Sequence, residues 1–231
     1  PVGIGDVFFT QKIAAHYVDK GYRIIWPVRS DLLWLNDYMI SPGVIYVDPS
    51  AAITVNDKVI VQEEQLNINL QSADDIYPNM SLLECKYKLV NLDYKDWKYY
   101  FNFKRNIEKE DELFYKVLKL KDTDKYAFVN KFVGTPALNS NTAGLERREK
   151  VQPTTRIKQV DLRLIAGYNV LDWCKVLEQA SEIYMIDTSF NYIMEKLYLQ
   201  AHTKKLYSRY TPADFSHIKN LWDVDWELID L

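Results

Sequence analysis

The sequence is poor in cysteine, histidine and glycine, and the first two shortages argue against a disulfide-stabilised fold and a metal site. Its two cysteines, Cys85 and Cys174, lie in apolar stretches. No disulfide framework is visible, and we expect buried free thiols in a reducing compartment. The three histidines are far apart and lack the spacing of metal ligands. We therefore expect no metal site.

Long apolar runs and a basic excess are also missing. No apolar run is long enough to cross a bilayer, and no segment has the charged start and apolar middle of a signal peptide. The formal net charge is -3, with Lys and Arg spread along the chain, so no basic patch indicates nucleic-acid binding. We expect a cytoplasmic protein without a transmembrane segment or a nucleic-acid partner, while peripheral membrane contact stays open.

What is present is ample hydrophobic content, 48% of 231 residues, in an alternation of helices and strands that predicts an α/β fold with parallel sheets. In the first half we expect helices at 6–20, 31–38, 81–89, 93–103 and 108–118, and strands at 23–28, 44–47 and within 53–70. Trp97, Tyr99, Tyr100, Phe101 and Phe103 crowd together, which is more typical of packing than of a stacking platform for bases.

The second half repeats the alternation. We expect strands at 125–130, 160–165, 183–186 and 206–207, helices at 171–180 and 190–199, and a loop over 134–150. The domain boundary is predicted near residue 120, which gives an N-terminal lobe at 1–120 and a C-terminal lobe at 121–231. The Trp-rich tail is expected to pack back on the body.

Two short segments read as tight turns that feed helices, Gly3-Ile4-Gly5-Asp6 and Asp187-Thr188-Ser189. Such turns present free backbone N–H groups to a phosphate, although the same residues also serve as ordinary helix caps. A phosphate-binding glycine turn normally follows a buried strand, and none precedes Gly3. Either the natural chain begins upstream or that strand is absent.

The first turn, Gly5-Asp6-Val7 with Thr10 and an amphipathic helix behind it, resembles the opening of the heptosyltransferase-like glycosyltransferases. The segment Asp187-Thr188-Ser189, after the strand at 183–186, is similar to the family's later Asp-Thr-Gly turn, with Ser189 in place of glycine. The resemblance covers the two ends of the chain. It implies a GT-B arrangement of two Rossmann-like lobes facing a central cleft, with the acceptor bound mostly by the first lobe and the nucleotide-sugar donor by the second.

The resemblance also implies roles for individual residues. Asp6 would be the catalytic base, and Thr188 and Ser189 would hold the donor diphosphate. From the residues themselves, we expect Phe190 to add its backbone N–H, and Asp187, whose charge repels phosphate, to cap the helix or receive a ribose or sugar hydroxyl. The acceptor or phosphate region would include Gly3, Gly5, Thr10 and Asn130.

Cations should supplement the turns. Lys131 is the first candidate, because it follows the strand that opens the second lobe, and open α/β sheets bind ligands at the carboxyl ends of their strands. Arg209 follows the strand at 206–207 and is the second. Arg147, Arg148, Lys150 and Arg156 are further candidates, for which a solvated surface role is the simpler interpretation.

Together these residues predict a metal-independent glycosyltransferase that moves a sugar from a nucleotide-diphosphate sugar to a hydroxyl of a glycan or lipid-linked acceptor. No cofactor beyond the donor is expected. The alternatives are a non-catalytic nucleotide-sugar-binding module and another nucleotide-binding enzyme, such as a GT-B type epimerase. A dehydrogenase is disfavoured, because Gly3-Ile4-Gly5 lacks the third glycine and no acidic residue ends the strand at 23–28.

Overall fold

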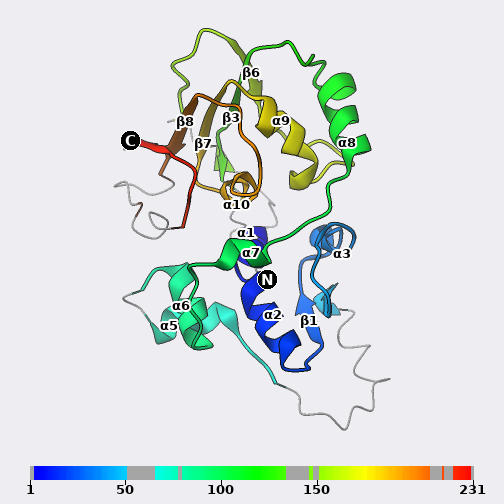
Figure 1. Cartoon of the computed structure of the whole chain (residues 1–231), viewed down its shortest axis with the longest axis vertical. Coiled ribbons are helices and arrows are strands. Elements are labelled where there is room, and N and C mark those ends of the chain that lie inside the picture. Colours follow the sequence, from blue (N-terminus) through cyan, green and yellow to red (C-terminus); the bar gives the residue numbers. More distant parts are fainter. Residues whose placement is uncertain are drawn as a thin grey trace. The chain divides into compact units, whose positions relative to one another are not determined.

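The computed structural model describes residues 3–50, 66–77, 80–133, 146–147, 151–208, 215 and 221–229. The chain forms two compact units, Pro1–Lys104 (unit 1) and Arg105–Leu231 (unit 2), which are drawn in Figure 1. The division falls between Lys104 and Arg105, earlier in the chain than the boundary predicted near residue 120.

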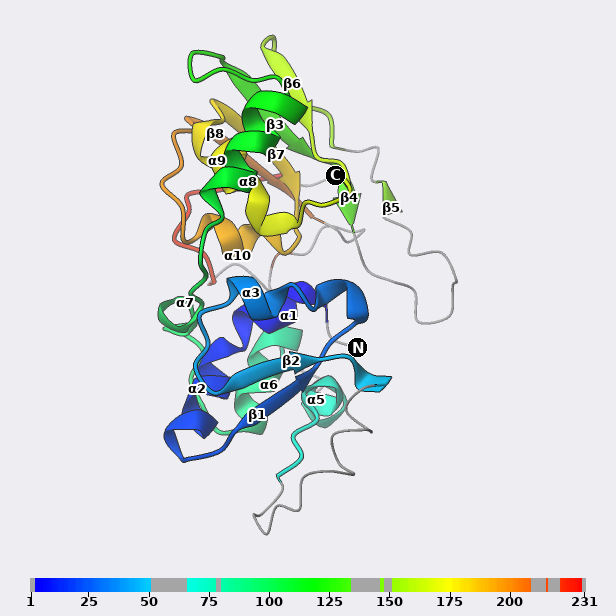
Figure 2. The ribbon, with the colours of Figure 1, turned by 90° about the vertical axis from the view of Figure 1, so that its right-hand side faces the viewer.

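Unit 1 combines a small parallel sheet with short helices (Figure 2). The sheet pairs β1 (Ile24–Pro27) with β2 (Val44–Val47). The helical elements are α1 (Ile4–Phe9), α2 (Gln11–Asp19), η1 (Ser30–Leu32), α3 (Leu35–Tyr38), η2 (Leu70–Ser72), α5 (Ala73–Ile76), α6 (Leu82–Leu89) and α7 (Trp97–Tyr100). Of the segment 53–70, where strands were predicted, residues 66–70 contain no strand, and the rest lies outside the described residues.

The helix predicted over 6–20 is two helices, and the first begins earlier than expected. Gly3 is the N-cap of α1, so Gly5 and Asp6 lie in its first turn and not in a loop before it. Thr10 separates α1 from α2, and its hydroxyl donates a hydrogen bond of 2.6 Å to the Asp6 carbonyl. A Thr side chain that bonds to the carbonyl four residues earlier offers the backbone an alternative to regular helix, which accounts for the break.

The aromatic group near residue 100 is mainly packing, as predicted. Trp97 and Phe101 are buried, and the Phe101 ring stacks on Phe8 with centroids 4.6 Å apart. The Trp97 ring lies 5.4 Å from Phe9. Tyr99, in contrast, is exposed. These contacts fix α7 against α1, where the two predicted glycines and Asp6 lie.

Unit 2 contains a five-stranded, fully parallel sheet in the order β6-β3-β7-β8-β9, which confirms the α/β prediction for this unit. The strands are β3 (Tyr126–Asn130), β6 (Lys158–Asp161), β7 (Glu182–Ile186), β8 (Thr203–Tyr207) and β9 (Glu227–Ile229). The C-terminal tail contributes β9, which pairs with β8. A separate antiparallel pair joins β4 (Phe132–Val133) to β5 (Glu146–Arg147), and β5 falls within the predicted loop at 134–150, whose other residues lie outside the described part of the chain.

The helices of unit 2 cover one face of this sheet (Figure 2). They are α8 (Ile107–Asp111), the π-helical η3 (Glu112–Val117), η4 (Val170–Trp173), α9 (Cys174–Gln179) and α10 (Phe190–Met194). The Phe128 ring lies 6.0 Å from both Trp173 and Phe190 on this face. Val129 points to the other face, where it packs in a cluster with Val151, from the connection between β3 and β6. Because that connection crosses the sheet in the opposite direction to the helical ones, a right-handed crossover places it on the opposite face.

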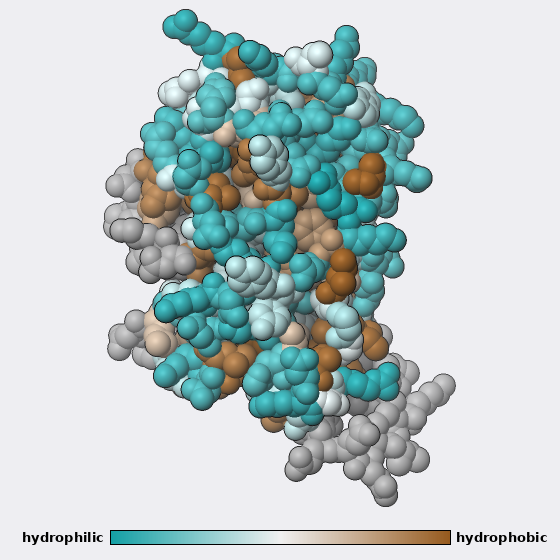
Figure 3. Space-filling view, viewed as in Figure 1, coloured by the Kyte–Doolittle hydropathy of each residue, from teal (hydrophilic) through white to brown (hydrophobic). Residues whose placement is uncertain are grey.

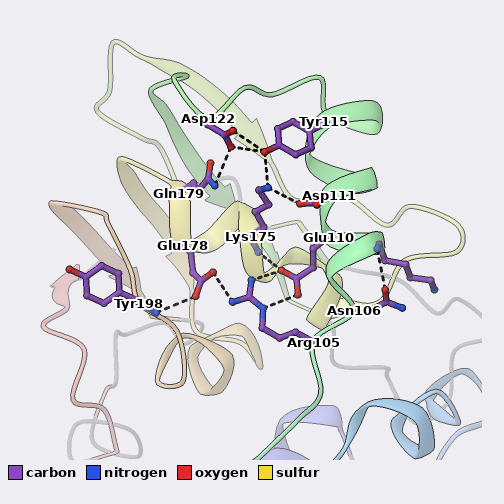
Figure 4. A network of polar contacts seen from close by, with 11 residues as sticks. Arg105, Asn106, Glu110, Asp111, Tyr115, Asp122, Lys175, Glu178, Gln179 and Tyr198 are labelled. Atoms are coloured by element: carbon purple, nitrogen blue, oxygen red, sulfur yellow. Dashed lines mark hydrogen bonds and ion pairs between the residues drawn. The ribbon is translucent and has the colours of Figure 1, made fainter.

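A polar network joins the first residue of unit 2 to α8 and α9 (Figure 4). The Arg105 guanidinium donates to the Glu110 carboxylate, with one bond of 2.8 Å, and to Glu178 at 2.8 Å. Glu110 is only 1% exposed, and it also accepts the Lys175 backbone N–H at 3.1 Å. The hydrogen bonds that Arg105 donates to Glu110 raise the pKa of Arg105 above its ordinary value, so this residue remains charged. The network explains why residues 105–120 belong to unit 2.

Both cysteines are free and buried, as predicted. Burial raises the pKa of the Cys174 thiol well above its ordinary value, so it is protonated at neutral pH. A buried, protonated thiol is a poor nucleophile, and we assign Cys174 a packing role.

Hydrophilic residues cover most of the face drawn in Figure 3, with hydrophobic residues in small scattered patches. None of the helices in the described part of the chain combines the length and apolar character that a membrane crossing requires.

Candidate functional site

The candidate site is the carboxyl edge of the unit 2 sheet, between β3 and β7. The chain runs from β3 to β6 on one side and then returns past β3 to β7 on the other, which is the flavodoxin-like strand order. Open parallel sheets bind ligands outside the carboxyl ends of the strands where the order reverses. This reversal lies between Asn130, which ends β3, and Asp187, which follows β7.

Two of the predicted site residues meet at this point. The Asn130 side-chain amide donates a hydrogen bond of 3.2 Å to the Thr188 hydroxyl. Asn130 is 1% exposed, whereas Thr188 and Ser189 are half-buried. The sheet therefore brings together polar groups that are far apart in the sequence, and one of the two residues, Thr188, is partly open to solvent.

Two buried residues near Thr188, Asp187 and Phe190, are used mainly in contacts within the protein. The Asp187 backbone N–H donates to the Tyr207 carbonyl at 3.1 Å, which continues the pairing of β7 with β8. Its carboxylate is buried and accepts from the Asn191 amide at 3.4 Å. The Phe190 side chain is buried against Phe128, which leaves only its backbone for a ligand. Because α10 has five residues, its dipole adds little to anion binding.

Among the predicted cations that the structure describes, Lys131 lies at this edge. It follows β3 directly, and its ammonium lies 3.6 Å from the carboxylate of Asp161, which ends β6. The two side chains are 18% and 58% exposed, respectively, so the pair is partly solvated and weak. An anion that binds at this edge would compete with Asp161 for Lys131.

Of the other predicted cations, the structure describes the side chain of Arg156 alone. Arg156 is exposed. Arg209, Arg148 and Lys150 lie outside the described residues, as does the side chain of Arg147.

The Asp6 carboxylate of unit 1 is held from both of its oxygens. One oxygen forms an ion pair with Lys86, and the other accepts the Gly3 backbone N–H at 3.2 Å. Lys86 is 1% exposed and Asp6 is 20% exposed. Asp6 therefore neutralises a buried ammonium and caps α1, whether or not it also takes part in chemistry.

The remaining predicted residues of unit 1 surround this pair. Gly3 supplies the N-cap of α1, and Gly5 lies in its first turn. Thr10 is fully buried, and its hydroxyl donates its hydrogen to the Asp6 carbonyl oxygen. Within unit 1, only Asp6 among the predicted residues presents a partly exposed functional group on its side chain.

Sequence reasoning missed Lys86 and Ser208. Lys86 lies on α6 in the same helical stripe as Leu83 and Tyr87, both buried, and a lysine on an apolar stripe is a signal that could have marked it. Ser208 is buried and follows β8 at the same edge as Thr188. Nothing in the local pattern distinguishes it.

Comparisons with models of known protein families, with curated proteins and with solved structures found no match for this chain. Among the described residues, no three His, Cys, Asp or Glu side chains gather in a way that could hold a metal ion.

Proposed function

We propose that the protein is a glycosyltransferase whose unit 2 binds a nucleotide-diphosphate sugar at the carboxyl edge of its sheet. The observation that carries this proposal is the Asn130–Thr188 contact at the point where the strand order reverses. Thr188 and Ser189 are half-buried residues whose hydroxyls are suited to phosphate oxygens, and Lys131, directly after β3, is a cation at the carboxyl edge of the same sheet.

In this proposal the edge stabilises the leaving group. As the bond to the sugar breaks, negative charge builds on the diphosphate, and fixed hydroxyl and ammonium donors lower the free energy of that state. Hydrogen bonds to a charged group contribute about 1.5–3 kcal/mol each. The proposal includes the two-lobed GT-B arrangement and places the acceptor with unit 1.

Asp6 is the proposed base for the acceptor hydroxyl. A general base must come within hydrogen-bond reach of the proton that it takes. Because both oxygens of Asp6 already have partners, the acceptor would have to reach the carboxylate through its exposed part.

The same observation favours a second candidate function, a nucleotide-sugar-binding module without turnover. If Asp6 serves only Gly3 and Lys86, unit 2 would still bind a nucleotide sugar, and no transfer would follow. The two candidates share the donor site and differ only in chemistry.

A thermal-shift panel of UDP, GDP, ADP and CMP sugars tests the shared part. A ligand at 100 times its dissociation constant stabilises the folded protein by about 2.7 kcal/mol, which raises the melting temperature measurably. Thr188→Val should reduce the shift, because it removes a hydroxyl at the edge and keeps the side-chain shape. If no sugar nucleotide shifts the melting temperature, the proposal fails. Release of the nucleoside diphosphate from the sugar nucleotide that binds, with acceptor glycans present, separates the transferase from the binding module.

A further inference from the structure

We propose that Asn130 is a positioning residue that turns the Thr188 hydroxyl into a dedicated hydrogen-bond donor for a phosphate oxygen of the ligand. This inference rests on the proposed function, and it states that the carboxyl edge offers the ligand a hydrogen-bond donor and not an acceptor. It assigns Asn130 no contact with the reacting atoms.

The position of Asn130 is fixed by the sheet. It is the last residue of β3, opposite Met185 of β7, and β3 is an interior strand that lies between β6 and β7 in the parallel sheet. It is 1% exposed, and its side chain lies on the same face as Tyr126 and Phe128 because side chains alternate along a strand. A buried amide in the middle of a sheet has few orientations available, so the direction of its hydrogen bond is well defined.

The polarity follows from the chemistry of the two groups. A side-chain amide nitrogen can only donate, and a hydroxyl has one hydrogen and two lone pairs. Since the Asn130 nitrogen donates to the Thr188 oxygen at 3.2 Å, that bond uses a lone pair of Thr188 and leaves its hydrogen for another acceptor. Among the residues that the structure describes, no acceptor for this hydrogen is found.

The partly open Thr188 side chain therefore favours ligands that present an acceptor oxygen. Phosphate oxygens carry negative charge and accept strongly, whereas an amine or amide nitrogen with hydrogens would meet the Thr188 hydrogen unfavourably. Lys131, at the same edge of the sheet, carries a positive charge, which attracts the negative charge of a phosphate. The combination favours the charged oxygens of the diphosphate over the neutral acceptor atoms of the base.

A double-mutant cycle tests the inference. The dissociation constants of UDP, GDP, ADP, CMP and inorganic pyrophosphate are measured by calorimetry for the wild type, Asn130→Ala, Thr188→Val and the double variant. For the probe that binds the wild type most tightly, we expect Thr188→Val to raise the dissociation constant by at least about tenfold, as for the loss of a hydrogen bond to a charged group. Asn130→Ala should weaken it severalfold when Thr188 is present and should have no effect when Val is there.

Two controls separate positioning from general damage. Thr203→Val makes the same substitution at the amino end of β8, away from the carboxyl edge, and should leave every dissociation constant unchanged. Melting temperatures without ligand identify variants that are merely destabilised, and Asn130→Ser replaces Asn130→Ala if the latter does not fold.

The outcomes are distinguishable. If a nucleotide binds and the effects of the two substitutions simply add, or if Asn130→Ala leaves affinity unchanged or improves it, the inference is overturned while the proposed function stands. If pyrophosphate alone binds, the proposed function fails and the cycle with pyrophosphate still decides the inference. If the wild type binds none of these probes, both are overturned.

Discussion

The carboxyl edge of unit 2 and the Asp6 turn of unit 1 are similar in sequence and differ in what their side chains already do. In the sequence, both contain an Asp and a Thr near a turn that was predicted to feed a helix. At the unit 2 edge, Thr188 is half-buried and its hydroxyl accepts one hydrogen bond from Asn130. At the unit 1 turn, both oxygens of Asp6 are used by Gly3 and Lys86.

This difference shows that the side chain of a motif residue can be engaged in contacts that stabilise the fold, which leaves it less available to a ligand. Asp6 compensates a buried charge, and the free energy of unfolding depends on it. Thr188 contributes one half-buried hydrogen bond, so its loss should cost little stability and much ligand affinity. Stability and affinity measurements therefore separate the two regions.

The largest expected effect is on stability, at Asp6. Asp6→Asn leaves the Lys86 ammonium buried without a counter-charge, which should lower the free energy of unfolding by about 3 kcal/mol. Urea unfolding followed by circular dichroism measures the change. The double variant Asp6→Asn with Lys86→Met should recover most of the loss, because it removes the buried charge as well.

Asp96→Asn is the matched control for Asp6→Asn. Asp96 pairs with Lys12 in the same unit, and the Asp96 side chain is 46% exposed. Its loss should cost less than about 1 kcal/mol, as for other exposed ion pairs. Equal effects of Asp6→Asn and Asp96→Asn would contradict the structural role of Asp6.

Alkaline pH should lower the stability of both units through buried tyrosines. Burial, and next to it the hydrogen bond with Glu182, raises the pKa of Tyr184 in unit 2 from 10.0 to about 12. Burial also raises the pKa of Tyr87, whose hydroxyl donates to the Phe9 carbonyl beside the Asp6 turn.

The sign follows from linkage. The unfolded chain loses these protons first, so the stability that the neutral tyrosines contribute is complete below pH 10 and is lost as the pH rises toward 12. Urea unfolding across this range should show a falling free energy of unfolding, with a shallower fall for Tyr184→Phe. A fall of the same steepness in that variant would be evidence against the raised pKa of Tyr184.

The smallest expected effect is at Asp161, which pairs with Lys131 at the unit 2 edge. Asp161→Asn removes the carboxylate that competes with a ligand for Lys131, and it should tighten pyrophosphate binding by up to about fivefold. Asp225→Asn is the matched control, since Asp225 pairs with Lys204 near the amino end of β8. Weaker binding by Asp161→Asn, or equal gains in both variants, would argue against Lys131 as a ligand cation.

The parts of the fold that the sequence predicted best are the buried strands. Apolar runs such as Tyr126–Asn130 and Glu182–Ile186 are strands because a central parallel strand is buried on both faces. Helix bounds were predicted less well. The break at Thr10 depends on one side-chain bond, and the helix expected at 108–118 turns π-helical from Glu112 onward. The predicted boundary near 120 could not take account of Arg105, whose partner Glu178 lies far along the chain.

The candidate site was predicted in part. The Asp187-Thr188-Ser189 segment and Asn130 were both named from the sequence, and each lies at the end of a recognisable strand, since Asn130 ends β3 and the segment follows β7. Their contact could not be predicted, since it depends on β3 and β7 being neighbours with β6 on the far side. The pairing of Asp6 with Lys86 could not be predicted from the sequence pattern either, because tertiary packing alone decides an ion pair between residues 80 positions apart.

Hydrogen exchange measured by mass spectrometry, with and without a saturating nucleoside diphosphate, tests the central claim most directly. The account predicts slower exchange in peptides that cover 128–133 and 186–192, at the carboxyl edge of the unit 2 sheet, and unchanged exchange in peptides that cover 3–12. Slower exchange confined to 3–12, or no change in either region, would contradict it.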